Sequence, residues 1–365
     1  MSSDLVMVVA ICAALAFAFT NGFHDTFDVI STAVSTGAAP PQVAISVAAL
    51  LNFAGACISV GVAATIAHQV VEVGAITPGV VFAGLIGAIA WNLATWYLGL
   101  PSSSSHALIG GLVGATLAAA GTSAVIGRGL LEKVLLPALL APLGAFAIAG
   151  FAIVLIYRFV GYRRPGPVTR AFRHAQILSG GLLALGHGAN DAQKTMGVIV
   201  LAMIANGSLA ADAGPPFWVI AAAGASIALG TYSGGWRMMR MSGSRIIKMD
   251  AAQGFSAQGA GAATILAATF LGFPISSTHA ISGGVMGAGA VRRLSAVRWG
   301  VAGNIVTAWL LTLPASAAIG AAAYGLSRIF GTGALGPMMV TLLALLVIVL
   351  AFARRAQQGA AATAA

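Results

Sequence analysis

Eleven long apolar stretches dominate this chain, and they restrict what it can fold into more than any other feature. Each is long enough, or nearly so, to cross a hydrocarbon core as a helix, which takes about 20 residues. A backbone inside hydrocarbon must satisfy its own hydrogen bonds, so each crossing is expected to be helical. The predicted fold is therefore an all-α integral membrane protein with about 10–12 transmembrane segments. The stretches are 5–34, 43–68, 79–99, 104–127, 134–157, 176–206, 216–234, 251–271, 274–291, 299–326 and 336–353.

The low charge content supports the same class. Of the 365 residues, 59% are hydrophobic and only 7% are charged, whereas a soluble domain carries about 25% charged residues. So few charges cannot cover a water-facing surface, which excludes a cytosolic enzyme, a secreted disulfide scaffold and a disordered regulator. The two cysteines, Cys12 and Cys57, lie in apolar runs and imply no disulfide framework.

The formal net charge of +10 reads as a topology signal and not as a nucleic-acid-binding surface. With the N-terminus outside and alternating spans, most Lys and Arg residues fall on the cytoplasmic side, as the positive-inside rule requires. A multi-pass protein of the cell membrane with cytoplasmic basic loops and no nucleic-acid partner is predicted. The basic residues placed inside are Arg158, Arg163, Arg164, Arg170, Arg173, Arg237, Arg240, Arg245, Lys248, Arg292, Arg293, Arg298, Arg354 and Arg355.

Two short motifs occur twice, in the same order. The segment NGFHD at 21–25 has a counterpart in HGAND at 187–191, and PSSSSH at 101–106 has one in PISSTH at 274–279. The first span runs inward in this topology and its counterpart runs outward, so the repeats are predicted to be inverted, as in many secondary transporters. Pro101 and Pro274 are where interrupted or re-entrant helices are expected. The predicted division is a first inverted repeat at 1–157, a basic cytoplasmic linker at 158–175, a second inverted repeat at 176–328, and an additional C-terminal helix and tail at 329–365.

Three of the eight acidic residues lie inside predicted spans: Asp25, Asp28 and Asp191. A charged side chain at the centre of a bilayer costs about 3 kcal/mol on insertion scales, so such residues indicate function. The alternative is that they lie near an interface or only hold helices together. Two of them occupy equivalent repeat positions, which favours function.

The serine tracts predict an anion site. Each follows a proline and precedes an apolar, glycine-rich run, which is the layout of a half-helix that starts inside the membrane. Free backbone N–H groups and the positive end of the helix dipole then favour an anion. Two such ends facing each other would suit a tetrahedral oxyanion, whereas the simpler alternative is helix capping alone. The candidate anion contacts are Ser103, Ser104, Ser105, Ser276, Ser277 and Thr278.

A histidine ends each tract, at His106 and His279. No His-rich or Cys-rich spacing supports a zinc site, so no metal ligand is assigned. A Ser–His catalytic pair is disfavoured because adjacent helical residues point about 100° apart, and no G-x-S-x-G element occurs. The histidines are expected to bond to backbone or to a neighbouring helix, with proton handling as the alternative. The chain is not predicted to be an enzyme.

The four motifs resemble those of the PiT family of inorganic phosphate transporters, and in particular its bacterial low-affinity permeases. That family carries a G-x-N-D type motif and a P-x-S-(S/T)-(S/T)-H type motif in each of two inverted repeats, and the resemblance covers nearly the whole chain. It implies a secondary active importer of inorganic phosphate, driven by a coupling cation, with phosphate between the serine and threonine tracts. The cation contacts that it implies are Asn21, Asp25, Asn190 and Asp191, with no other cofactor.

One departure from the family pattern concerns charge. Three residues after each motif aspartate the family often has asparagine, but this chain has Asp28 and Lys194. The two charges either pair across the repeat axis, which requires good hydrogen bonding, or Lys194 pairs with Asp191 one helical turn away.

A second departure is His24, which replaces the asparagine that the other motif keeps as Asn190. A titratable His24 beside Asp25, together with an ammonium where a sodium-coupled relative needs an empty site, favours proton over sodium coupling. The resemblance also suggests that phosphate travels as a complex with a divalent metal in bacterial members.

Other functions remain open. A sulfate permease of the same fold is the nearest alternative. An anion channel is disfavoured by the buried aspartates, and an intramembrane hydrolase lacks a positioned nucleophile. Glycine-rich faces would serve internal packing or a homodimer equally well.

Overall fold

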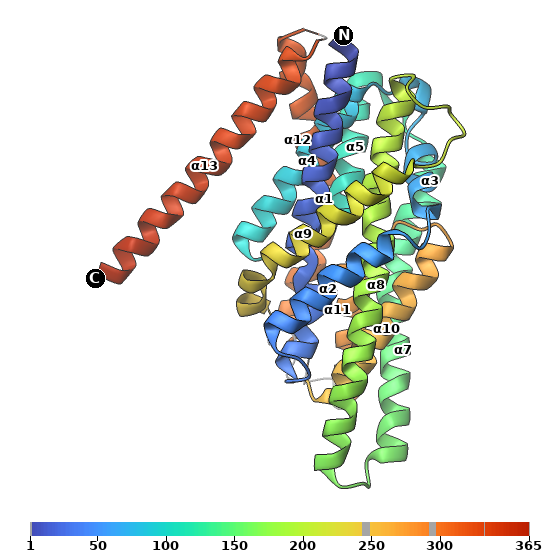
Figure 1. Cartoon of the computed structure of the whole chain (residues 1–365), viewed down its shortest axis with the longest axis vertical. Coiled ribbons are helices and arrows are strands. Elements are labelled where there is room, and N and C mark those ends of the chain that lie inside the picture. Colours follow the sequence, from blue (N-terminus) through green and yellow to red (C-terminus); the bar gives the residue numbers. More distant parts are fainter. Residues whose placement is uncertain (1, 243–248, 292–296, 332, 365) are drawn as a thin grey trace.

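The computed structural model describes residues 2–242, 249–291, 297–331 and 333–364, and nearly all of them are helical (Figure 1). The β-structure in these ranges is one isolated bridge between Val71 and Val125. Short 3-10 helices lie at Val73–Ala75 and Thr122–Ala124, and a π-helical segment at Leu130–Leu135 joins α6 and α7 into one continuous helical span. The helices are α1 Ser2–Ser35, α2 Pro41–Ala56, α3 Gly61–His68, α4 Pro78–Leu98, α5 Ser104–Ala120, α6 Gly127–Gly129, α7 Leu136–Val160, α8 Pro165–Ala205, α9 Phe217–Ser242, α10 Ala251–Phe270, α11 Ser277–Ala290, α12 Trp299–Ile329 and α13 Leu335–Ala364.

Within the described ranges, five helical segments are long and apolar enough to cross a membrane, or six if α2 and α3, which are bent by 67°, form one broken span. The sequence predicts about 10–12 segments at about 20 residues each. Two physical reasons account for most of the difference, and the apolar part of α13, Leu335–Leu350, is also shorter than 18 residues. Helices α5 and α11 have 17 and 14 residues, and at about 1.5 Å per residue they are shorter than a hydrocarbon core of about 30 Å. Helices α8 and α10 carry several polar residues that face the interior.

Both short helices follow a break in the chain, where the prolines predict one. Gly99 ends α4 with φ +70°, and Gly272 follows α10 with φ +74°; this left-handed conformation is the usual glycine stop after a helix. The chain then passes through Pro101 or Pro274 and restarts as α5 or α11. The structure therefore contains two interrupted helices, at matching places in the two halves.

The same helix contacts occur in both halves, and in each contact a helix of one half packs on a helix of the other half. Helix α1 packs on α9 as α8 packs on α2, and α5 packs on α12 as α11 packs on α7. The closest approaches match as well: a Cβ on Gly22 would overlap the Ile227 carbonyl, and one on Gly188 would overlap the Asn52 carbonyl. Small residues of this kind let helix backbones touch in membranes. A twofold relation between 1–157 and 176–328 would produce this pattern, and that division stays a prediction.

The segment predicted as a basic linker, 158–175, is mostly helical. Helix α7 runs to Val160 and α8 begins at Pro165, so only 161–164 connect them. Proline fits the first turn of a helix, where its missing N–H would have no partner. This hairpin lies at the end of the molecule opposite the N-terminus (Figure 1). Which end faces the cytoplasm stays a prediction, and four of the basic residues used for it, Arg245, Lys248, Arg292 and Arg293, lie outside the described residues.

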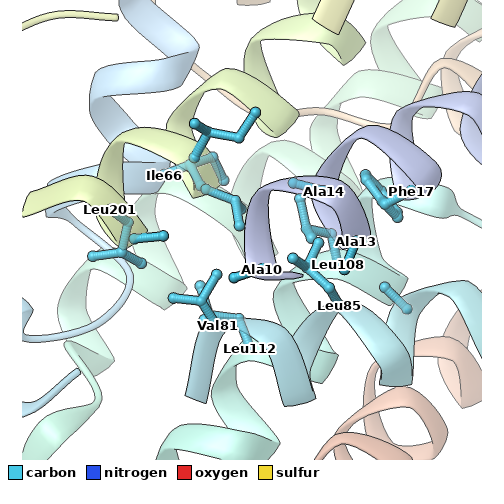
Figure 2. Packing of buried hydrophobic residues seen from close by; sticks show 14 of the residues in the cluster. Ala10, Ala13, Ala14, Phe17, Ile66, Val81, Leu85, Leu108, Leu112 and Leu201 are labelled. Carbon is cyan, nitrogen blue, oxygen red and sulfur yellow. The ribbon is translucent and has the colours of Figure 1, made fainter. Parts of the chain in front are cut away.

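Each interrupted helix is held in an apolar cluster. Figure 2 shows one of them, where Phe17 of α1, Leu85 of α4 and Leu108 of α5 pack together. In the other half, Ile265 of α10 and Ile281 of α11 belong to a second buried cluster. These clusters fix the start of α5 and the start of α11 in the interior of the bundle.

Candidate functional site

The two breaks meet in the interior. The ring centres of His106 and His279 lie 4.8 Å apart, and the Ser105 hydroxyl donates to the Ile275 carbonyl oxygen over 3.0 Å. All residues from 102 to 106 and from 276 to 279 are buried, none more than 4% exposed. The N-terminal ends of α5 and α11 therefore converge on one enclosed region.

Two of the six predicted anion contacts act as helix caps. The Ser103 hydroxyl oxygen accepts the N–H of His106 over 3.1 Å, and Ser276 accepts the N–H of His279 over 3.3 Å. This is the capping role that was the alternative for the tracts. Ser104 differs, because its hydroxyl donates to Asp25 Oδ1 over 3.1 Å. The Ser277 hydroxyl has no hydrogen-bond partner within the described ranges.

The other two predicted contacts reach across to the opposite half. Thr278 donates to Asp28 Oδ2 over 2.6 Å, and Ser105 accepts from Lys194 Nζ over 2.6 Å. Ser105 and Thr278 hold equivalent places in the two tracts, and so do Asp28 and Lys194 after the two motif aspartates. Each tract is thus bonded to the long helix of the other half.

Lys194 forms an ion pair with Asp191. Its Nζ is 2.6 Å from Asp191 Oδ1 and also donates to the Ile275 carbonyl over 2.7 Å, with both side chains fully buried. Of the two arrangements that the sequence leaves open, the structure has the pairing one turn apart. Asp28 bonds to Thr278 instead, so its charge and that of Lys194 meet different partners.

A carboxylate centre forms where α1 and α8 cross. Asn21 Nδ2 donates to Asp191 Oδ2 over 3.2 Å. His187 Nε2 lies 3.6 Å from the same oxygen and 4.0 Å from Asp25 Oδ2. Asn21 and His187 are the first residues of the two equivalent motifs, so each motif contributes to the aspartate of the other.

His187 was not among the predicted site residues. Its Nδ1 is 3.2 Å from Asn52 Oδ1, and because an amide oxygen only accepts, Nδ1 carries the proton. The Nε2 atom then faces the carboxylates of Asp25 and Asp191. A signal was available, since His187 lies one helical turn before Asp191, but the role of Asn52 on α2 is not visible in the sequence.

These residues could hold a cation. Asp25, His187 and Asp191 each offer one ligand atom, all within 4.8 Å of one another and all buried. Two carboxylate oxygens and one imidazole nitrogen are ligands for divalent metals. The sequence assigns no metal because the group is assembled from two distant helices and not from a local spacing.

The remaining two predicted residues point to the breaks. His24 Nδ1 is 2.6 Å from Asp25 Oδ1, and its Nε2 is 3.3 Å from the Thr95 hydroxyl. Asn190 donates to the Thr269 hydroxyl over 2.9 Å and to the Phe273 carbonyl over 3.1 Å. The two therefore link their motifs to the helix before each break, and only His24 also touches a motif aspartate.

Comparisons with known proteins agree with one another. The model of the family described as "Phosphate transporter family" matches residues 21–320. A Mycobacterium bovis protein is 46% identical over 327 residues, covering 89% of this chain and 78% of that protein, and a Rhizobium meliloti protein is 47% identical over 321 residues, covering 87% and 96%. Both are described as a probable low-affinity inorganic phosphate transporter. A solved structure described as "The sodium-dependent phosphate transporter" aligns with a TM-score of 0.82 at 26% identity, covering 89% of this chain and 99% of the other.

Proposed function

Because this chain belongs to the phosphate transporter family, we propose that it is a secondary active transporter that imports inorganic phosphate together with a coupling cation. The observation that carries the proposal is the meeting of the starts of α5 and α11 beside two buried aspartates. The similar proteins are named as transporters and not as enzymes.

The anion would lie between the two helix starts. The first turn of a helix leaves backbone N–H groups without intrahelical acceptors, and its positive dipole end attracts an anion. The Ser277 hydroxyl, which has no partner in the described ranges, would add a donor next to these groups. The Ser104 hydroxyl would add another by turning away from Asp25, to which it now donates. Ser103 and Ser276 contribute by holding the helix starts in shape. Donors from two opposed helix ends suit the tetrahedral phosphate ion.

The coupling cation would act at the carboxylate centre. Two like charges 4 Å apart repel by about 4 kcal/mol at an effective dielectric constant of 20, so phosphate beside Asp25 and Asp191 needs compensation. Lys194 already compensates Asp191. His24 bonds to Asp25 and can carry a proton. We therefore propose the proton as the coupling ion, with a divalent metal at Asp25, His187 and Asp191 for phosphate that travels as a metal complex. The loaded halves would then rock and expose phosphate to the cytoplasm.

Sodium is the alternative coupling ion, favoured by the likeness to a solved transporter that is described as sodium-dependent. Purified protein in liposomes separates the two. We expect labelled phosphate to accumulate when the interior is alkaline and sodium is absent, and a sodium gradient alone to have little effect. An absolute requirement for sodium would contradict proton coupling. No accumulation under either gradient would contradict phosphate import, and strong competition by excess sulfate would contradict selectivity for phosphate.

Replacing Lys194 by methionine should lower uptake at least about tenfold. A buried charge that loses its partner costs about 3–5 kcal/mol, so Asp191 is expected to recruit another cation, and residual uptake should depend more steeply on external proton or sodium concentration. Uptake in liposomes against both concentrations measures this. Arg164→Gln is the control, since it removes one positive charge at an exposed position in the turn between α7 and α8. Equal uptake in both variants would contradict the role of Lys194.

A further inference from the structure

We propose that His106 and His279 together bind one proton, and that they do so when phosphate occupies the adjoining serine and threonine tracts. This pair would be a second proton site, separate from His24 and Asp25. The proposal rests on the proposed function, since it concerns the same anion site.

The pair lies where the two halves touch. His106 is the third residue of α5 and His279 the third residue of α11, and the two rings meet edge to face with an angle of 73° and centres 4.8 Å apart. Two imidazoles that share an N–H···N hydrogen bond have ring centres about 5 Å apart. The backbone thus already places the rings at the separation that a shared proton needs, and only ring rotation remains.

All four ring nitrogens are buried and without a hydrogen-bond partner of good geometry in the described part of the chain. The Ala138 backbone on α7 faces His279 but does not meet that geometry. His279 also stacks on Trp309 of α12, with ring centres 3.9 Å apart, so no water layer separates these rings. A buried polar group left without a partner costs about 1–3 kcal/mol. Two neutral rings could share an N–H···N bond after rotation, but one added proton makes that bond charge-assisted and about twice as strong, because the imidazolium donates its N–H to the neutral ring.

Without an anion, the surroundings oppose this proton. The facing charged group is Lys194, whose ammonium donates to Ser105, the residue before His106. Both rings also lie at helix N-termini, where the dipole is positive. Helices α4 and α10 contain no charged residue, and α7 and α12 have only Arg158 and Arg328 near their far ends. Asp25, Asp28 and Asp191 are already bonded to His24, Thr278 and Lys194.

Phosphate reverses that balance. An anion between the tracts would lie close to both histidines, because both rings belong to the first turns of α5 and α11 and meet where these two helix starts converge. Its negative charge offsets the repulsion from Lys194 and the helix ends, so proton binding and anion binding favour each other. By linkage, the proton must raise the affinity for phosphate by the same factor that phosphate raises the affinity for the proton. The histidine pair would in this way couple phosphate binding to proton binding, and no carboxylate would be needed for this coupling.

The test is the pH dependence of phosphate binding by the purified full-length protein. We expect the slope of log Kd against pH between pH 5.5 and 8.5 to fall by up to one proton equivalent when His106 and His279 are both replaced by asparagine. Labelled phosphate should still bind. A His106→Phe and His279→Phe variant, which keeps the aromatic packing, should show the same flattened slope. His174→Asn, at an exposed position on α8, is the control and should keep the slope of the original chain.

An unchanged slope in either double variant would overturn the proposal. If neither variant assembles, nitrogen-15 spectra of the original chain, labelled at its six histidines, provide a second measurement. Phosphate should then convert one buried ring to the doubly protonated form, and spectra unaltered by phosphate would overturn the proposal. Failure of the proposed function looks different, because the original chain would neither bind nor take up phosphate.

Discussion

Uptake of labelled phosphate should fall at least about a hundredfold when either Asp25 or Asp191 is replaced by asparagine, while the protein still inserts in the membrane. Asparagine has almost the same shape but no charge, so the carboxylate centre would lose the group that we propose holds the coupling cation. A hundredfold loss corresponds to about 2.7 kcal/mol, less than the about 4 kcal/mol estimated for one such charge interaction. Initial uptake rates in liposomes, normalised to the amount of inserted protein, measure it.

The two variants should also differ from each other. Asp191→Asn leaves the buried ammonium of Lys194 without its partner, so this variant should also unfold at a lower temperature. Asp25→Asn leaves that ion pair in place and should retain more of its stability. Asp212→Asn, at an exposed acid between α8 and α9, is the control and should transport normally. Near-normal uptake by both buried variants would rule out the carboxylate centre as the coupling site.

Alanine at Gly22 or at Gly188 should prevent most of the protein from folding. The added methyl group would overlap a backbone carbonyl oxygen, of Ile227 in one case and Asn52 in the other. A backbone atom cannot rotate away, so α1 would have to separate from α9, or α8 from α2. Overpacking typically costs about 1–3 kcal/mol and occasionally more, and we expect the upper end here because the contact is with backbone. Yield of monodisperse protein in detergent and its unfolding temperature are the measurements.

Gly144→Ala is the matched control. Gly144 also lies within a helix, α7, but a Cβ there meets nothing within 4 Å. Since alanine favours a helix over glycine by about 0.5–1 kcal/mol, this variant should be as stable as the original chain or slightly more so. Unfolding temperatures of Gly22→Ala and Gly188→Ala close to that of Gly144→Ala would show that these contacts are loose. Similar losses in both variants are expected if the halves are equivalent.

The membrane class and the chain breaks could be predicted because they depend on local sequence. Long apolar runs require helices in lipid, and a proline before a serine tract interrupts one. The repeated motifs also indicated which tracts belong together, and the structure brings His106 and His279 side by side. The family follows from the same motifs and agrees with the match over 21–320.

The chemistry within the site was harder to predict, because it depends on contacts between distant helices. Sequence spacing allows Lys194 two partners, and only the structure shows that it pairs with Asp191 on its own helix while Asp28 bonds to Thr278. Ser103 and Ser104 look alike in a run of four serines, yet one caps α5 and the other bonds to Asp25. His187 joins the centre because Asn52 on α2 orients its ring. The start of α8 at Pro165 could not be predicted either, because its first turns are rich in basic residues and have the composition of a loop.

Asp28 and Lys194 occupy matching positions but carry opposite signs, each bonded to the hydroxyl of the opposing tract. In a carrier with two identical halves, the outward-open and inward-open shapes would have the same free energy. The empty protein would then spend equal time in each shape. Opposite charges remove that degeneracy, because swapping the conformations of the two halves places a carboxylate where an ammonium had been. If the halves exchange conformations as the predicted inverted repeat implies, the outward-open and inward-open shapes of the empty protein would therefore differ in energy before any gradient acts on it.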